Sequence, residues 1–268
     1  MMNSIFSEGF VRISVFFSCI LIFALLELKL PRRELAYSKS RRWSVNIGIS
    51  VINTAFVRLV FPVAGVASAM IASDNNWGFL NRLDIDDHVG IPLFLLAFDL
   101  MIYWQHRLFH AVSFLWRFHR MHHTDPDYDL STGNRFHPVE ILLSALIKCV
   151  LILLLGPPAV AVLIAEVVLN ATSIFNHSNI RLPHSLDTVL RRVIVSPDMH
   201  RVHHSVERQE HDSNFGFNLS IWDRIFGSYT AQPAAGHEAM EIGIRGFRGD
   251  ESISLWKMLL QPGQKNRG

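Results

Sequence analysis

Long apolar runs separated by short charged stretches dominate the pattern along this chain of 268 residues. A helix needs about 20 mostly apolar residues to cross a hydrocarbon core of roughly 30 Å. The third such run is short, but it continues without a break into a stretch rich in histidine. The pattern predicts an all-α integral membrane protein with spanning segments near residues 10–30, 45–71, 91–104, 139–155 and 159–175.

The tripeptide "GPP" separates the last two of these segments. Gly156, Pro157 and Pro158 should end one helix and turn the chain, because proline lacks the amide hydrogen and clashes with the preceding turn. The resulting hairpin either crosses the bilayer twice or re-enters it. The number of crossings is therefore four or five.

Positive charge predicts the orientation of these segments. Arginine and lysine crowd the loop at residues 31–42, whereas the loop from Asp74 to His88 carries four aspartates and one arginine. Short loops rich in Lys and Arg stay in the cytoplasm. Alternation then puts residues 106–138, and everything after the fifth segment, on the cytoplasmic side. We expect an inner or plasma membrane protein if the source is bacterial, and an endoplasmic reticulum protein if it is eukaryotic.

Composition agrees with a membrane protein and argues against a nucleic-acid partner. Half of the residues are hydrophobic and 18% are charged, with a formal net charge of only +2. The basic residues flank apolar segments instead of forming one patch. Cys19 and Cys149 lie inside apolar runs and form no metal-binding spacing, so we expect both to be packing residues.

Histidine is the unusual residue, with fourteen in the chain and eleven of them between His106 and His204. The motif "HRLFH" spaces two histidines by four, and the first pentad, "HRMHH" (119–123), and the second pentad, "HRVHH" (200–204), use spacings of three and four. On a helix these spacings put side chains on one face. Neutral imidazole is a common ligand for iron, zinc, copper and nickel. Since one ion takes only a few protein ligands, the set predicts two metals: His106, His110, His119, His122, His123, His200, His203 and His204.

Two further histidines stand at the expected membrane boundary, His137 in "FHPVE" and His177 in "FNHSN". Both are candidate ligands. Asp99 precedes His106 by two helical turns, at a depth where an unpaired carboxylate is costly. We predict that Asp99 accepts a hydrogen bond from a ligand histidine and so orients its ring. Of the histidines outside these clusters, His184 is nearest the site and is a further possible ligand, whereas the other three are expected at the surface or in loops: His88, His211 and His237.

The segments "YWQHRLFH", "WRFHRMHH", "FNHSN", "PDMHRVHH" and "NFGFNLSIWDRIFGSY" together resemble the sterol desaturase/fatty acid hydroxylase superfamily of integral-membrane di-iron oxygenases. The resemblance covers roughly Asp99 to Tyr229. It implies two non-haem iron ions, O2 as co-substrate and hydroxylation of a C–H bond in a membrane lipid such as a fatty acyl chain or a sterol. It assigns the ligand role to the eight histidines above and to His177, and His137 fits with less support.

This resemblance implies a cytoplasmic helical cap that holds the two metals where cap and membrane meet. Residues 1–90 would form N-terminal membrane helices, residues 91–230 the catalytic domain and residues 231–268 a cytoplasmic tail. The chain has no dinucleotide-binding G-x-G-x-x-G. We therefore expect electrons from a partner, such as a ferredoxin or a cytochrome b5-like protein with its reductase.

Other functions remain open from the sequence. Desaturation begins with the same hydrogen abstraction, and the histidine spacing does not separate it from hydroxylation. A metal transporter would place its ligands near mid-bilayer, whereas these cluster at one boundary. A zinc hydrolase of the "HExxH" type lacks its motif here, and bis-histidine haem binding is a further alternative.

Overall fold

Helices make up the regular structure of this protein. The computed structural model describes residues 2–265, with side chains for residues 8–265. Within this part, β structure is limited to isolated bridges. The expected all-α fold is therefore confirmed.

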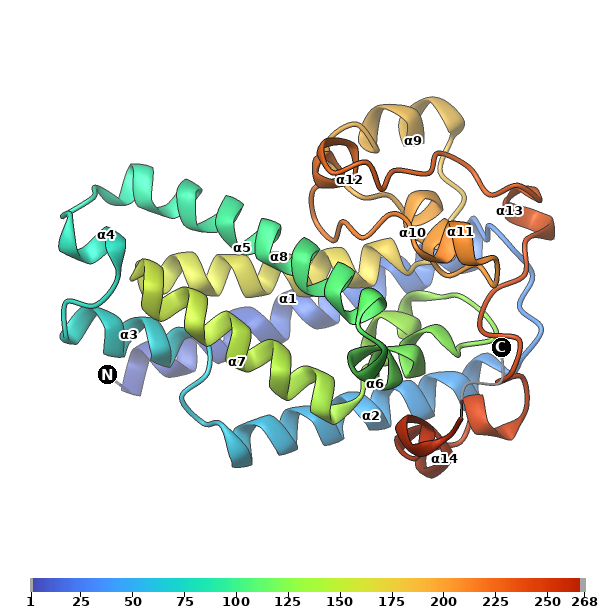
Figure 1. Ribbon diagram of the computed structural model, residues 1–268, viewed down its shortest axis with the longest axis horizontal. Helices are drawn as coiled ribbons and strands as arrows, with labels where there is room; N and C mark the ends of the chain where they lie inside the picture. Colours follow the sequence, from blue (N-terminus) through green and yellow to red (C-terminus); the bar gives the residue numbers. More distant parts are fainter. Residues whose placement is uncertain (1, 266–268) are drawn as a thin grey trace.

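Five helices are long and apolar enough to cross a membrane. They run along the long axis of the molecule (Figure 1), as an integral membrane protein requires. Each overlaps one predicted segment, but α1 begins earlier than predicted, α5 extends beyond residues 91–104 at both ends, and the second segment differs. The helices are α1 (Met2–Lys29), α2 (Lys39–Val60), α5 (Asp87–Ala111), α7 (Pro138–Leu155) and α8 (Ala159–Asn176).

The second predicted segment, residues 45–71, is not one helix. Helix α2 ends at Val60, and a separate helix α3 (Val66–Asp74) follows, with α4 (Phe79–Arg82) after it. Pro62 explains the break, because a proline disfavours the helical conformation of the residue before it. Gly65 then takes a φ of 69°, a left-handed value that favours glycine, at the start of α3.

The "GPP" sequence turns the chain between α7 and α8, as predicted. Gly156 ends α7 in the left-handed conformation with a φ of 64°, and Pro158 caps the start of α8. A Cβ on Gly156 would lie 2.3 Å from the carbonyl oxygen of Trp77. The position therefore needs glycine both for its conformation and for its space.

Aromatic and aliphatic side chains hold the long helices together. Phe94, Phe98 and Ile102 of α5 are buried against Ile152 of α7 and small residues of α8. The small residues let α8 approach closely, which is how helices pack where lipid removes the hydrophobic driving force. This core extends to Ile102, one turn before His106 on α5, so it positions the ends of α5 and α8 beside the histidines.

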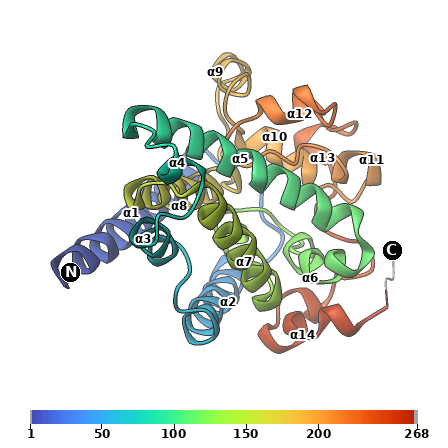
Figure 2. The same cartoon turned by 60° about the vertical axis from the view of Figure 1, so that its left-hand side comes forward.

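Short helices gather at one end of the long ones and form a cap (Figures 1 and 2). The cap also includes the C-terminal segment, in which Met258 packs on Ile49 and Met121. Its elements are α6 (Ser113–His123), η1 (Leu130–Asn134), α9 (His184–Leu190), α10 (Pro197–His203), α11 (Arg208–His211), α12 (Ile221–Ile225), α13 (Gly236–Ala239), η2 (Asp250–Ser252), α14 (Leu255–Leu259) and η3 (Gln261–Gly263).

A buried charge cluster joins the cap to α2. Arg42 makes two hydrogen bonds of 2.8 Å to Asp125 and one of 2.6 Å to Asp129. Burial alone would raise the pKa of Asp125, but the charges of Arg42 and Arg135 lower it to about 2. Arg135 also donates to the carbonyl oxygen of Met121, at 2.8 Å, within the first pentad. The cluster thus fixes the end of α6 that carries three histidines.

Replacing Arg42 by alanine should therefore destabilise the fold strongly. Two buried carboxylates would lose their main partner, which costs about 3–5 kcal/mol in free energy of unfolding. Thermal unfolding of the detergent-solubilised protein, followed by circular dichroism, measures this.

The matched control is Arg41→Ala, because Arg41 is exposed and pairs with exposed Asp250 at 3.2 Å. Loss of that surface pair should cost less than about 1 kcal/mol. Equal losses of stability in the two variants would contradict the role given to the buried cluster.

Candidate metal centre

Four chain segments bring their histidines to one place under the cap. The last two turns of α5 supply the "HRLFH" pair, α6 supplies the first pentad, and α10 supplies the second pentad, with His204 as its C-terminal cap. His177 caps the C-terminus of α8. The structure thus collects nine of the ten predicted ligands into two adjacent groups.

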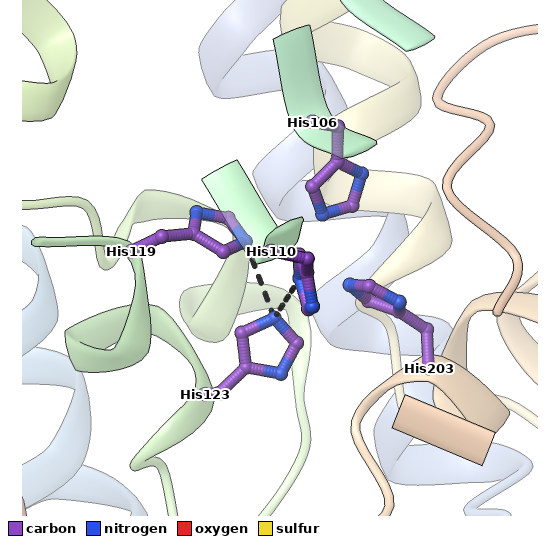
Figure 3. A group of neighbouring side chains, drawn as sticks. All are labelled: His106, His110, His119, His123 and His203. Carbon is purple, nitrogen blue, oxygen red and sulfur yellow. Dashed lines mark hydrogen bonds between the residues drawn. The ribbon is translucent and has the colours of Figure 1, made fainter. Parts of the chain in front are cut away.

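The first histidine group contains five rings, and Figure 3 shows them converging. The Nε2 atom of His123 lies 3.2 Å from the Nε2 atoms of both His110 and His119. Two nitrogens that share one ion at roughly 2.0–2.1 Å each stand about 3.0–3.4 Å apart. The spacing therefore suits a metal, and the five members are His106, His110, His119, His123 and His203.

The second histidine group contains four rings, all buried: His122, His177, His200 and His204. The Nε2 atom of His177 lies 3.1 Å from that of His122 and 3.0 Å from that of His200. His204 brings its ring centroid within 4.6 Å of the His122 ring. This group offers a second set of convergent donors beside the first.

Each pentad contributes to both groups. In the first pentad, His119 and His123 join the first group and His122 joins the second; in the second pentad, His203 joins the first group. The i, i+4 pairs share a group because they lie one turn apart on a helix face, and the remaining histidine points to the neighbouring group. A repeated H-x-x-H-H is thus a way to serve two sites from one helix.

Outward hydrogen bonds fix which ring nitrogen faces the interior. Nδ1 of His106 lies 2.8 Å from the carbonyl oxygen of Phe215, and Nδ1 of His203 lies 2.7 Å from that of Ser213. A carbonyl oxygen only accepts, so each Nδ1 must carry the proton. Nε2 then presents a lone pair inward, which is the form that binds a metal.

Glu140 and Ser173 play the same part for two more rings. Nδ1 of His119 donates to the Glu140 carboxylate at 2.7 Å, and Nδ1 of His177 donates to the Ser173 carbonyl oxygen at 2.7 Å. Glu140 lies in the first turn of α7 and is buried. The structure identifies it as the carboxylate that orients a histidine.

Asp99 does not make the predicted hydrogen bond to a histidine. Its carboxylate accepts from the amides of Asn218 and Leu219, at 3.3 and 3.1 Å, and from Nε1 of Trp222 at 2.8 Å. Three donors satisfy a charge buried in the membrane region, so the carboxylate needs no ring. Asp99 instead ties α5 to the loop that precedes α12.

Asp223 holds the same loop from its other side. It accepts from the amides of Phe215 and Gly216 at 2.7 and 2.8 Å, and from the Ser228 hydroxyl at 2.7 Å. Burial raises the pKa of Asp223 to about 6 despite these donors. In this loop, the carbonyl oxygen of Phe215 accepts the hydrogen bond from Nδ1 of His106. The "NFGFNLSIWDRIFGSY" segment therefore positions the His106 ring through its backbone.

The electrostatics keep the rings neutral. Burial lowers the pKa of His119 to about 3 and that of His177 to about 4. Burial, followed by the neighbouring imidazoles, lowers the pKa of five more rings well below the ordinary value: His122, His123, His200, His203 and His204. A neutral imidazole is ready to bind a cation without first losing a proton.

Unpartnered ring nitrogens test whether the donors suit a metal. The inward Nε2 atoms of His106 and His203, and both ring nitrogens of His204, are buried and have no hydrogen-bond partner among the described residues. A buried acceptor without a partner is costly. An all-imidazole donor set with such free lone pairs fits a transition metal such as iron or zinc.

The other histidines have different surroundings. His137 lies outside both groups: its Nδ1 accepts from the amide of Val139 at 3.1 Å and its Nε2 faces the carbonyl oxygen of Leu259 at 3.2 Å. It caps α7 instead. His211, expected in a loop, has its ring centroid 4.5 Å from that of His123 and forms a small group with His110 and Asp212. Only chain folding brings it there, since no neighbouring histidine marks it in the sequence.

Removal of the Glu140 carboxylate should weaken metal binding. In Glu140→Ala the His119 ring loses its acceptor and its fixed orientation, and such changes cost about 10–100-fold in metal affinity. Titration of the stripped protein with Fe(II) against a competing chelator measures the effect.

Glu238→Ala is the control, because Glu238 is an exposed acid of the cap. Its affinity should match that of the wild type. If Glu140→Ala also binds iron with wild-type affinity, the orienting role of the carboxylate is wrong.

Comparison with known proteins agrees with the geometry. The fatty acid hydroxylase family profile matches residues 91–228, slightly more than half of the chain. The chain is 27% identical over 239 residues to the ornithine lipid hydroxylase OlsE of Rhizobium tropici, covering 87% of this chain and 70% of that protein. No solved structure gives a significant match.

Shorter matches cover part of two other enzymes. The chain is 32% identical over 142 residues to the alkylglycerol monooxygenase of Homo sapiens, covering 51% of this chain and 30% of that protein. It is 30% identical over 142 residues to the lathosterol oxidase of Mus musculus, covering 53% of this chain and 45% of that protein. The chain thus spans less than half the length of these two relatives. Histidine groups, membrane helices and matched segment together place this chain in the fatty acid hydroxylase family of membrane lipid oxidoreductases.

Proposed function

We propose that this protein uses O2 and two non-haem iron ions to hydroxylate an unactivated C–H bond of a membrane lipid. The observation that carries the proposal is the pair of adjacent groups of buried, neutral imidazoles at the end of a cavity. When bound, the two irons would supply O2 activation and oxidation of the C–H bond. One iron would be held by the first histidine group and the other by the second.

A cavity of about 760 Å³ leads to the first histidine group, and His106 and His119 form part of its wall. Near these rings the wall includes the apolar side chains of Ile102, Phe109 and Phe217, with polar Gln105 next to His106 in the chain. Apolar walls accept a hydrocarbon segment and exclude water. A lipid chain in the cavity would therefore present its C–H bonds beside the metal ligands.

The choice of hydroxylation over desaturation follows the names of two of the relatives, a lipid hydroxylase and a monooxygenase. Both reactions would use the same site. Hydroxylation places an oxygen atom in the lipid product whereas desaturation does not, and this difference can be measured directly.

Electrons would come from a separate carrier, a ferredoxin or a cytochrome b5-like protein with its reductase. The chain carries no dinucleotide-binding motif of its own. The basic loop between α1 and α2 lies at the cap end and supports a cytoplasmic position for the metal centre, where such carriers are reduced. The membrane would be the plasma membrane in a bacterium and the endoplasmic reticulum in a eukaryote.

Iron content and oxygen incorporation test the proposal together. The wild-type protein should hold about two non-haem irons per chain, since each group offers a full set of donors. Cells that express it under isotopically labelled O2 should produce a labelled lipid, which mass spectrometry of the lipid extract would identify.

Two variants, one in each histidine group, test the assignment of one iron to each group. His203 and His204 adjoin in the sequence but belong to different groups, so His203→Ala and His204→Ala should each lower the iron content toward one and abolish the labelled lipid. A Soret band, stoichiometric zinc in an iron-replete preparation, or a lipid product that is unsaturated and unlabelled would contradict hydroxylation by two irons.

A further inference from the structure

The cavity that reaches the histidines has a charged end within the membrane-spanning helices. Arg12 of α1 pairs with Glu166 of α8 at 2.7 Å and with Glu8 at 2.8 Å, and Lys148 of α7 lies 3.9 Å from Glu166. All four side chains line the cavity. Lys148 and Glu166 stand near the middle of 18-residue helices. Charges at such depth are costly and face a bundle interior or a polar cavity when they serve a function.

The wall between the two ends of the cavity combines apolar side chains with a few uncharged polar ones. Lys148 follows Glu140, the partner of His119, by eight residues on α7, which is about 12 Å along the axis at 1.5 Å per residue. Ile141, Ala145 and Leu169 line this part of the cavity, with Ser144 and Asn170 beside them. A charged end, a middle without charged side chains and a metal end match an amphiphile that lies lengthwise.

The charged side chains at this end that have hydrogen-bond donors to spare indicate which kind of ligand head group could bind there. Arg12 is already matched by two carboxylates, but the Lys148 ammonium donates no hydrogen bond to a described residue and stands beyond hydrogen-bond distance of Glu166. Arg58, also on the cavity wall, forms no ion pair with any described residue. The unused donors at this end are therefore cationic.

The backbone at Gly65 lies close to the carboxylate of Glu166 at the charged end. Glu166 lies against Gly65, where a Cβ would stand 2.9 Å from its Oε2 atom. A larger residue at position 65 would push the carboxylate away from Arg12. Glycine here keeps Glu166 in the position that holds the guanidinium beside Lys148.

We propose that this end of the cavity binds the anionic group of the lipid substrate, a carboxylate or a phosphate, on Lys148 with Arg12 beside it. The hydrocarbon chain then runs to His106 and His119, so that a carbon remote from the anionic group lies at the metal end. An uncharged sterol or carotenoid would leave the Lys148 ammonium with only its 3.9 Å contact to Glu166. The statement about the oxidised carbon rests on the proposed function, whereas the binding of an anionic amphiphile does not.

Binding of three probes with the same chain tests this inference. The full-length protein in an uncharged maltoside detergent is titrated with dodecanoate, dodecyl phosphate and dodecanol, and bound ligand is counted by native mass spectrometry. At least one of the two anions should bind about tenfold or more tightly than dodecanol, because charge-assisted hydrogen bonds form only with the anion. The preferred anion tells a carboxylate lipid from a phosphate lipid.

Variants at the charged end sharpen the test. Lys148→Gln should weaken binding of the preferred anion about tenfold and leave dodecanol unchanged, while Lys148→Arg should stay close to wild type. Arg82→Gln is the control, since Arg82 is exposed and lies outside the cavity, and it should change nothing.

Equal binding of dodecanol and both anions by the wild type, or full anion binding by a folded Lys148→Gln protein, would overturn the inference. The wild-type comparison decides even if a variant fails to fold. The titration needs neither iron nor O2, so absence of iron or of labelled lipid would defeat the proposed function while leaving this result intact. A labelled neutral lipid without anion binding would support the proposed function and contradict the anion-binding inference.

Discussion

The confinement of nine imidazoles in one buried space is the constraint on which the rest of this structure depends. Protonated rings at these separations would repel one another in a medium of low dielectric constant, so the rings must be neutral. Neutral rings still need a donor partner for each inward lone pair and an acceptor for each outward proton. A cation satisfies the first need, and the surrounding chain satisfies part of the second with Glu140 and the carbonyl oxygens of Phe215, Ser213 and Ser173.

Local periodicity explains why much of this site is readable from the sequence. Spacings of three and four residues fix which side chains share a helix face, wherever the helix later lies. The pairs His106/His110 and His119/His123 therefore fall in one group, as expected from "HRLFH" and "HRMHH". The same holds for the long helices, since about 20 apolar residues cross a membrane regardless of their partners.

Contacts set by tertiary structure explain the differences. His137 has the residue type and boundary position of a ligand, but its ring caps the helix that begins beside it. His211 has no histidine within one helical turn in the sequence to mark it, yet α11 carries it to the ring of His123. The partners of Asp99 are mostly backbone amides, and every residue type except proline offers such an amide. A pattern of side chains cannot distinguish these cases.

Asp99 and Asp223, which hold the loop before α12, act on the metal centre indirectly, through that loop. Asp99 fixes the loop to α5 and Asp223 fixes its turn, while the loop presents the Phe215 carbonyl to His106. His106 itself comes from α5, two turns beyond Asp99. One helix therefore carries both the ring and the anchor of the group that orients it, so a shift of α5 moves ring and acceptor together. This arrangement keeps the His106 lone pair aimed inward even if the long helices move within the bilayer, which a carbonyl from an unattached loop could not do.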